Sequence, residues 1–174
     1  MTSNHTRRPE PWLRGTLTDV PPVARGVLHA LELAREDLHR WCDGLSVGQI
    51  HARPGGLPSV AFQLRHIGGS VDRLLTYAEG GTLSEAQFAG LTQESATHEE
   101  MAEELLKDLD VALERACERV RALATLDYSL RREVGRQKLP TTLGGLLVHV
   151  AEHTQRHAGQ AVTTAKLISG SNSF

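Results

Sequence analysis

The sequence lacks the features that mark several common classes of protein. Its only cysteines, Cys42 and Cys117, lie far apart and form no C-x-x-C pattern. A disulfide scaffold is therefore not expected, and the reducing cytoplasm is the expected compartment. No apolar run approaches the roughly 20 residues that span a bilayer. The opening residues, MTSNHTRRPEPWLRG, also lack the apolar stretch of a secretory signal.

Clusters of basic residues are missing as well. The chain has 19 Lys and Arg against 21 Asp and Glu, for a formal net charge of −2, and no basic run is longer than two residues. Nucleic-acid-binding surfaces normally need clustered Lys and Arg. The sequence therefore argues against nucleic acid and membrane as partners, and a small-molecule substrate is the expected partner.

Apolar residues at helical spacing are plentiful. Val27, Leu31, Ala34 and Leu38 illustrate steps of three and four residues, which place side chains on one face of a helix. After an N-terminal arm (residues 1–20), this spacing predicts four long helices, at about residues 21–44, 59–81, 97–124 and 141–170. Residues 80–90, GGTLSEAQFAG, are predicted to be a loop, and residues 127–142 to contain a short extended piece.

Four amphipathic segments without strong strands are typical of a helical bundle. The predicted fold is therefore all-α: an antiparallel four-helix bundle over residues 21–170, with a long connection between helices two and three. Two copies pairing through a helix face, as a homodimer, are a further expectation.

Three histidines stand four residues apart in the last predicted helix, in HVAEHTQRHAGQ. At 100° per residue, His149, His153 and His157 fall within 80° of one another, on the side opposite to Glu152. Adjacent pairs can share one ion, whereas His149 and His157 lie about 12 Å apart along the helix. His153 therefore belongs to either pair, and this geometry does not choose between His149 and His157.

A third protein ligand is expected from another helix, because open zinc sites typically have three. His66 is the best candidate, on the flank of the apolar stripe of the second predicted helix. Arg73 and Tyr77 lie near His66 on the helical wheel and are candidate pocket residues. The acidic residues considered, Glu152 and Asp72, face away from the ligands, so no general base is expected there.

The segments LRHIGGSVDRLLTY and HxxxHxxxHAGQ together resemble the DinB-like superfamily, which includes the YfiT-like metal-dependent hydrolases. The resemblance covers about residues 20–168. It implies that His66, His153 and His157 bind a divalent metal, with Gly159 and Gln160 as the Gly-Gln pair that follows the last ligand. His149 is then a supporting hydrogen-bond partner or an auxiliary ligand. Ala158 follows His157 where the family often has Gly.

The resemblance implies a metal-dependent enzyme. Some relatives are similar to bacillithiol- or mycothiol-dependent transferases. The expected chemistry is transfer of a low-molecular-weight thiol to an electrophilic small molecule, or hydrolysis by water activated on the metal. Zinc or nickel is the expected ion, with iron, manganese and copper as alternatives. The missing general base favours thiol activation. The alternative function is a non-catalytic stress-response bundle that binds a metal or ligand.

Overall fold

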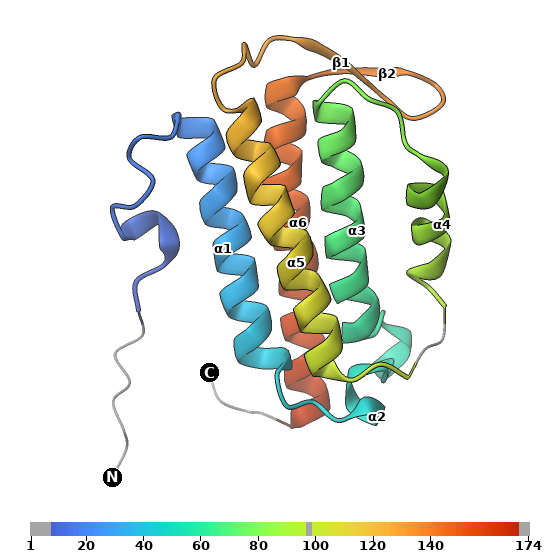
Figure 1. Ribbon diagram of the computed structural model, residues 1–174. Helices are drawn as coiled ribbons and strands as arrows, with labels where there is room; N and C mark the ends of the chain where they lie inside the picture. The colour runs from blue at the N-terminus through green and yellow to red at the C-terminus, as the bar shows by residue number, and fades with distance from the viewer. Residues whose placement is uncertain (1–7, 97–98, 171–174) are drawn as a thin grey trace.

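The computed structural model describes residues 8–96 and 99–170 and is mostly helical (Figure 1). The long helices are α1 (Pro22–Cys42), α3 (Val60–Ala78), α5 (Ala102–Leu123) and α6 (Leu143–Ser169). The short helices are α2 (Val47–Ile50) and α4 (Glu85–Gln93), and 3₁₀ turns cover Pro11–Leu13 and Pro54–Gly56. Strands β1 (Arg131–Val134) and β2 (Leu139–Thr142) form an antiparallel hairpin.

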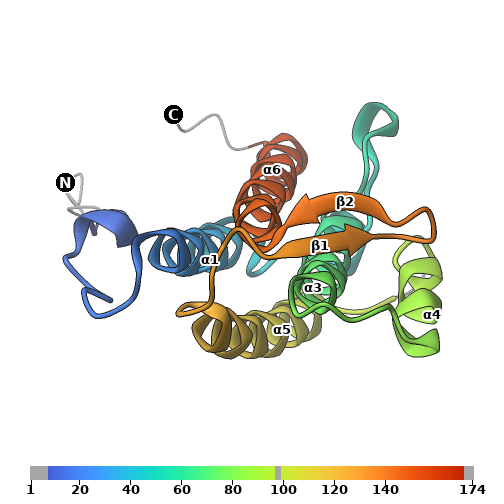
Figure 2. The ribbon, with the colours of Figure 1, turned by 90° about the horizontal axis from the view of Figure 1, so that it is seen from above.

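The four long helices lie side by side in a ring. Helix α1 packs against α5 and α6, and α3 packs against the same two helices, so that α1 and α3 face each other across the centre (Figure 2). The hairpin lies over the end where α3 ends and α6 begins, and α4 lies outside the ring beside α3. None of the helices in the described part of the chain is both long and apolar enough to cross a membrane.

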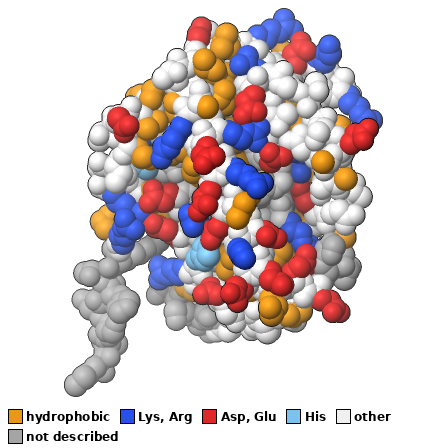
Figure 3. Space-filling view, viewed as in Figure 1, with side chains coloured by type: hydrophobic (Ala, Val, Ile, Leu, Met, Phe, Trp, Pro, Cys, Tyr) orange, Lys and Arg blue, Asp and Glu red, His pale blue; other side chains and the backbone are white. Residues whose placement is uncertain are grey.

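The apolar stripes predicted from the sequence form the core. Leu31, Leu64, Leu109 and Val150, one from each long helix, are almost fully buried in a single hydrophobic cluster. Charged side chains of both signs are interspersed on the outer surface, as the face in Figure 3 shows. Burial of these stripes is the main driving force for helix packing.

Helix ends coincide with capping residues. Ser59 and Thr142 accept hydrogen bonds from the backbone N–H groups of Phe62 and Gly145, which fixes the starts of α3 and α6. Helix α6 ends at Gly170, whose φ of +62° suits a glycine in the left-handed region. The predicted start of the third long helix, Thr97, lies outside the described residues, and α5 itself begins at Ala102.

Two sequence predictions need correction. Residues 80–90 are not wholly a loop, because α4 occupies Glu85–Gln93. The neighbours are also not all antiparallel: α1 and α6 run in the same direction, and so do α3 and α5 (Figure 1). The physical reason is the long connection through α4, which returns the chain to the end where α3 begins, so that α5 starts beside the start of α3. The extended piece predicted within residues 127–142 is confirmed as the β1–β2 hairpin.

Candidate metal centre

The three histidines that the resemblance implies as ligands meet between α3 and α6. His66 lies on the second turn of α3, and His153 and His157 lie one turn apart in the middle of α6. One ring nitrogen from each of the three lies within 4.8 Å of those of the other two. The ring centroids of His66 and His157 are 4.3 Å apart, and those of His153 and His157 are 4.4 Å apart. This is close enough for one ion to lie among them.

Hydrogen bonds fix the orientation of two of these rings. Nδ1 of His66 donates to the carboxylate of Glu94 at 2.8 Å, and Nδ1 of His157 donates to Oε1 of Gln63 at 2.7 Å. Gln63 is fully buried, and its own amide donates to Oε1 of Gln160 at 3.1 Å, which sets the direction of the amide group. In both histidines the proton is therefore on Nδ1, and Nε2 carries the lone pair.

The third ring follows the same pattern. The Ser70 hydroxyl donates to the carbonyl oxygen of Ile67 at 3.1 Å, so its oxygen is left to accept from Nδ1 of His153, 3.4 Å away. All three histidines thus offer Nε2 as the free nitrogen. Metal-binding histidines typically donate their other ring N–H in this way, which holds the tautomer and the ring orientation.

Burial keeps the two α6 histidines neutral. Burial, with smaller contributions from neighbouring His157 and His66, lowers the pKa of His153 to about 4. Burial also lowers the pKa of His157. Neutral imidazoles are the form that binds a metal, so neither ring has to lose a proton at neutral pH. Three imidazole nitrogens around one point fit a divalent transition metal such as zinc or nickel.

Comparison with known families agrees with this geometry. The family model of the DinB superfamily matches residues 30–161, which include all three histidines and most of the four long helices. The chain belongs to the DinB superfamily. A search of curated proteins found no match.

Two of the predicted supporting residues lie at this DinB site. Gln160 holds Gln63, which in turn holds His157. Arg73 is buried and forms an ion pair with Glu94, 2.6 Å from its carboxylate. Each of these residues therefore contacts a side chain that is itself hydrogen-bonded to a candidate ligand: Gln160 contacts Gln63, and Arg73 contacts Glu94.

The other two predicted supporting residues are not among the converging ligands, although the His149 ring packs edge-on against His153 with centroids 5.3 Å apart. Nδ1 of His149 is 2.6 Å from the carboxylate of Glu152, on the partly exposed outer side of α6, and His149 is outside the group of converging nitrogens. Tyr77 lines a different cavity, with the β1–β2 hairpin. The helical wheel places Tyr77 and His66 at similar angles around the helix. The 11-residue step between these positions, however, separates them by about 16 Å along the helix axis, so they do not share one site.

Glu94 is the site residue that sequence reasoning missed. It caps the C-terminal end of α4, is 5% exposed, and bonds both His66 and Arg73. A carboxylate does therefore lie beside the ligands, contrary to the expectation drawn from Glu152 and Asp72. Helix α4 buries none of its residues, so it has no apolar stripe to reveal it. The available signal was the Ser84-x-x-Gln87 capping box at its start.

Glu94 is held as a carboxylate in this DinB protein. Burial alone would raise its pKa, but the hydrogen bond from His66 and the pairing with Arg73 outweigh burial and hold the pKa below its ordinary value. Its two oxygens face different partners, with Oε2 toward His66 and Oε1 toward Arg73. The group is thus a fixed anion behind the ligand His66.

Proposed function

We propose that the four long helices act as a DinB-type bundle that holds one divalent metal ion on His66, His153 and His157. The proposed reaction is transfer of a low-molecular-weight thiol to an electrophilic small molecule, and hydrolysis is the related alternative at the same site. The observation that carries the proposal is the convergence of the three imidazoles, each with one ring nitrogen within 4.8 Å of the other two, while Nδ1 of His66 and of His157 lies against Glu94 and Gln63.

The expected chemistry follows from a three-ligand site. A divalent ion on three imidazoles keeps at least one position open and lowers the pKa of a thiol or water bound there. The protein groups bind and orient: His66, His153 and His157 would hold the ion, while Glu94, Gln63 and Ser70 contact Nδ1 of the three rings. The charge of Glu94 would make His66 a stronger electron donor to a bound ion.

The placement of the acidic groups supports thiol transfer over hydrolysis. The hydrogen bond from His66 and the pairing with Arg73 hold the pKa of Glu94 below its ordinary value, so this carboxylate is a weak base toward water. Glu152 is engaged by His149 and Arg156 on the outer side of α6. A thiol needs no such base, because binding to the ion removes its proton directly.

The proposal is tested with the purified protein loaded with Zn²⁺ or Ni²⁺. One metal ion per chain is expected, and the melting temperature is expected to rise with added metal because the ion binds only the folded state. The loaded protein is then assayed for conjugation of a thiol with an aryl chloride, in which a carbon–sulfur bond forms, chloride leaves and the thiol proton goes to buffer. A panel of esters, amides and phosphoesters tests hydrolysis.

The matched control is His153→Ala, which removes one ligand and leaves the neighbouring helix positions unchanged. We expect metal-dependent turnover in the wild-type protein and none in this variant. Stoichiometric metal with no turnover on either panel would overturn the enzymatic proposal and favour the non-catalytic binding bundle. Absence of stoichiometric metal would overturn the site itself.

A further inference from the structure

A cavity of about 370 Å³ adjoins the histidine cluster. It lies between the segment leading into α3 and the residues that follow α4. Two of its lining residues contact His66: the Phe62 ring stacks on the imidazole with centroids 5.4 Å apart, and Glu94 accepts the hydrogen bond from Nδ1. A molecule in this cavity is therefore one side chain away from a candidate metal ligand. The volume is within the range of small-molecule sites.

Most charges around this cavity are already paired. Arg65, on its wall, reaches the Glu100 carboxylate at 2.6 Å. Glu94 is paired with Arg73, as described above. His51 donates from Nε2 to the backbone oxygen of Glu100 at 3.0 Å.

Arg53 is the exception. Its side chain lines the cavity and is exposed at the rim. In the described ranges, residues 8–96 and 99–170, no carboxylate forms an ion pair with Arg53. The cavity therefore has one surplus positive charge, carried by a guanidinium, which binds carboxylates through two parallel hydrogen bonds.

Apolar side chains also line the cavity. Phe62 and Pro58 are among its lining residues, and the Phe62 ring, which stacks on His66, is within 9° of parallel to that imidazole. An aromatic face of this kind favours a flat apolar body that stacks or packs edge-on against it. One uncommitted cation balances the single charge of a carboxylate, whereas a phosphate dianion would need a second.

We infer that this cavity binds a small carboxylate with a flat apolar body, with the carboxylate on Arg53 and the body against Phe62 and Pro58. This inference goes beyond the proposed function, since the cavity lies behind His66, on the side of Nδ1 and Glu94, and none of the three candidate metal ligands lines it. The end of the molecule remote from Arg53 then lies toward Phe62 and Glu94. Arg53 is accordingly a binding residue that selects ligands by charge.

Benzoate is the probe, because it is a flat ring with one carboxylate. Its dissociation constant is measured by calorimetry, and its position by chemical-shift changes, in the metal-loaded and the metal-free protein. Arg53→Ala is expected to weaken benzoate binding at least tenfold in both forms. The matched control is Arg115→Ala, which removes an exposed arginine on α5 that does not line this cavity and is expected to change nothing.

Two further ligands test the chemistry. Benzamide, which has the same ring without the charge, is expected to bind at least tenfold more weakly than benzoate, and phenyl phosphate is expected to bind no more tightly. The inference is overturned if benzoate does not bind at millimolar concentration. It is also overturned if Arg53→Ala and Arg115→Ala behave alike, or if benzamide equals benzoate.

This experiment separates the two proposals. Arg53-dependent benzoate binding without stoichiometric metal would uphold the cavity and overturn the proposed metal function. Stoichiometric metal with turnover, but with benzoate binding independent of Arg53, would uphold the function and overturn the ligand class assigned to the cavity.

Discussion

At the scale of single residues, the hydrogen bond between Glu94 and His66 depends on how closely the Glu94 carboxylate approaches the backbone of α3. A Cβ atom at Gly69 would lie 2.4 Å from Oε1 of Glu94 and 2.8 Å from Nη1 of Arg73. Contacts this short do not occur between a side-chain carbon and a polar atom, so only glycine leaves room for the Glu94–Arg73 pair. A side chain at position 69 therefore displaces the ends of the Glu94 and Arg73 side chains from their present positions beside His66.

The first prediction concerns Gly69→Ala. The added methyl group displaces the Glu94 carboxylate, and His66 loses its hydrogen-bond partner. We expect metal affinity to fall by about 10- to 100-fold, as is typical when a partner behind a metal ligand is lost, while the helix content by circular dichroism stays unchanged. The control is Gly159→Ala, next to His157, where a Cβ atom meets nothing within 4 Å. Equal affinities for the two variants would contradict the assigned role of Gly69.

The second prediction separates the histidines of α6. His153→Ala and His157→Ala are each expected to abolish stoichiometric metal, as is His66→Ala on α3. His149→Ala is expected to retain most of the metal, because its Nδ1 faces Glu152 and its ring lies outside the converging group. Metal content per chain after dialysis is the measurement. Loss of metal in His149→Ala with retention in His157→Ala would show that the ligands had been assigned wrongly.

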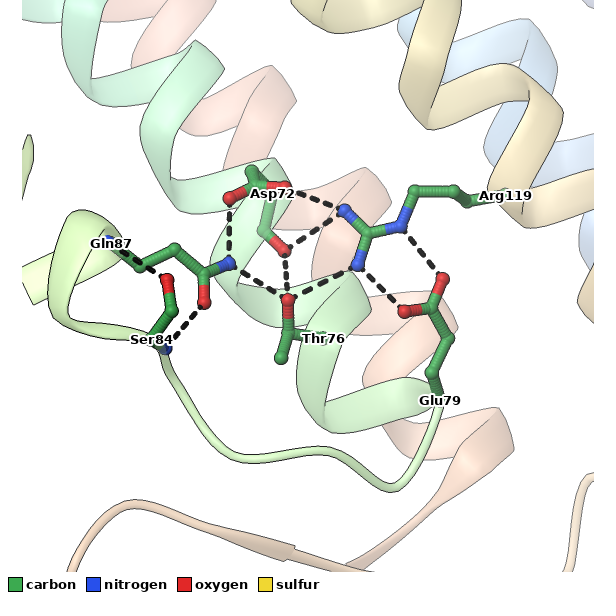
Figure 4. A network of polar contacts seen from close by, with 6 residues as sticks. All are labelled: Asp72, Thr76, Glu79, Ser84, Gln87 and Arg119. Carbon is green, nitrogen blue, oxygen red and sulfur yellow. Dashed lines mark hydrogen bonds and ion pairs between the residues drawn. The ribbon is translucent and has the colours of Figure 1, made fainter.

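At the scale of elements, α4 is attached to the ring of long helices by polar contacts at both ends. Near its start, the Gln87 amide donates to the Asp72 carboxylate at 2.6 Å and to the Thr76 hydroxyl at 2.8 Å (Figure 4). Arg119 of α5 reaches the same two residues and also pairs with Glu79. At the other end, Glu94 joins α4 to the histidine cluster through its hydrogen bond with His66. Since α4 buries none of its residues, these contacts hold the position of Glu94.

The third prediction tests this attachment. Gln87→Ala removes the bonds to Asp72 and Thr76 as well as the reciprocal capping bond with Ser84. We expect amide hydrogen exchange to become several-fold faster or more across α4 and to stay unchanged in α6, because the loss is local.

The control for this third prediction is Gln93→Ala, on the same helix. Gln93 is exposed, and its side chain forms no hydrogen bond with the described residues. If Gln93→Ala accelerated exchange as much as Gln87→Ala, the polar anchor would not be what holds α4.

At the scale of the whole molecule, the site depends on the contact between α3 and α6. These helices are separated by more than sixty residues of chain, yet His66, Ser70 and Gln63 of one meet His153 and His157 of the other. The core residues of both helices belong to one hydrophobic cluster. The packing that stabilises the fold is thus the same packing that brings the imidazoles together.

The fourth prediction compares two adjacent residues of α6. Leu147 is fully buried, whereas Val148 is 57% exposed. Leu147→Ala is expected to lower the free energy of unfolding by about 2–5 kcal/mol, because it removes packed core methyl groups and leaves a cavity. Val148→Ala is expected to change it by less than about 0.5 kcal/mol. Urea denaturation measures both, and similar values would contradict the assigned core face of α6.

The sequence by itself determined the helical class and the positions of the long helices, because apolar periodicity and caps such as Ser59, Thr142 and Gly170 are local signals. It also identified the three histidines, though only the resemblance selected His157 over His149. Wheel angles alone leave that choice open, since they give the direction of a side chain but not which neighbour it meets.

Only the tertiary structure decided the rest. Glu94 comes from a surface helix with no apolar stripe, and it reaches His66 because the long connection leads the chain back along α3. The same connection decided which long helices run in the same direction. The shared tautomer of the three imidazoles depends on Gln63, Ser70 and Glu94, which come together only when α3, α4 and α6 are packed. Such partners are close in space and distant in sequence, so no local pattern encodes them.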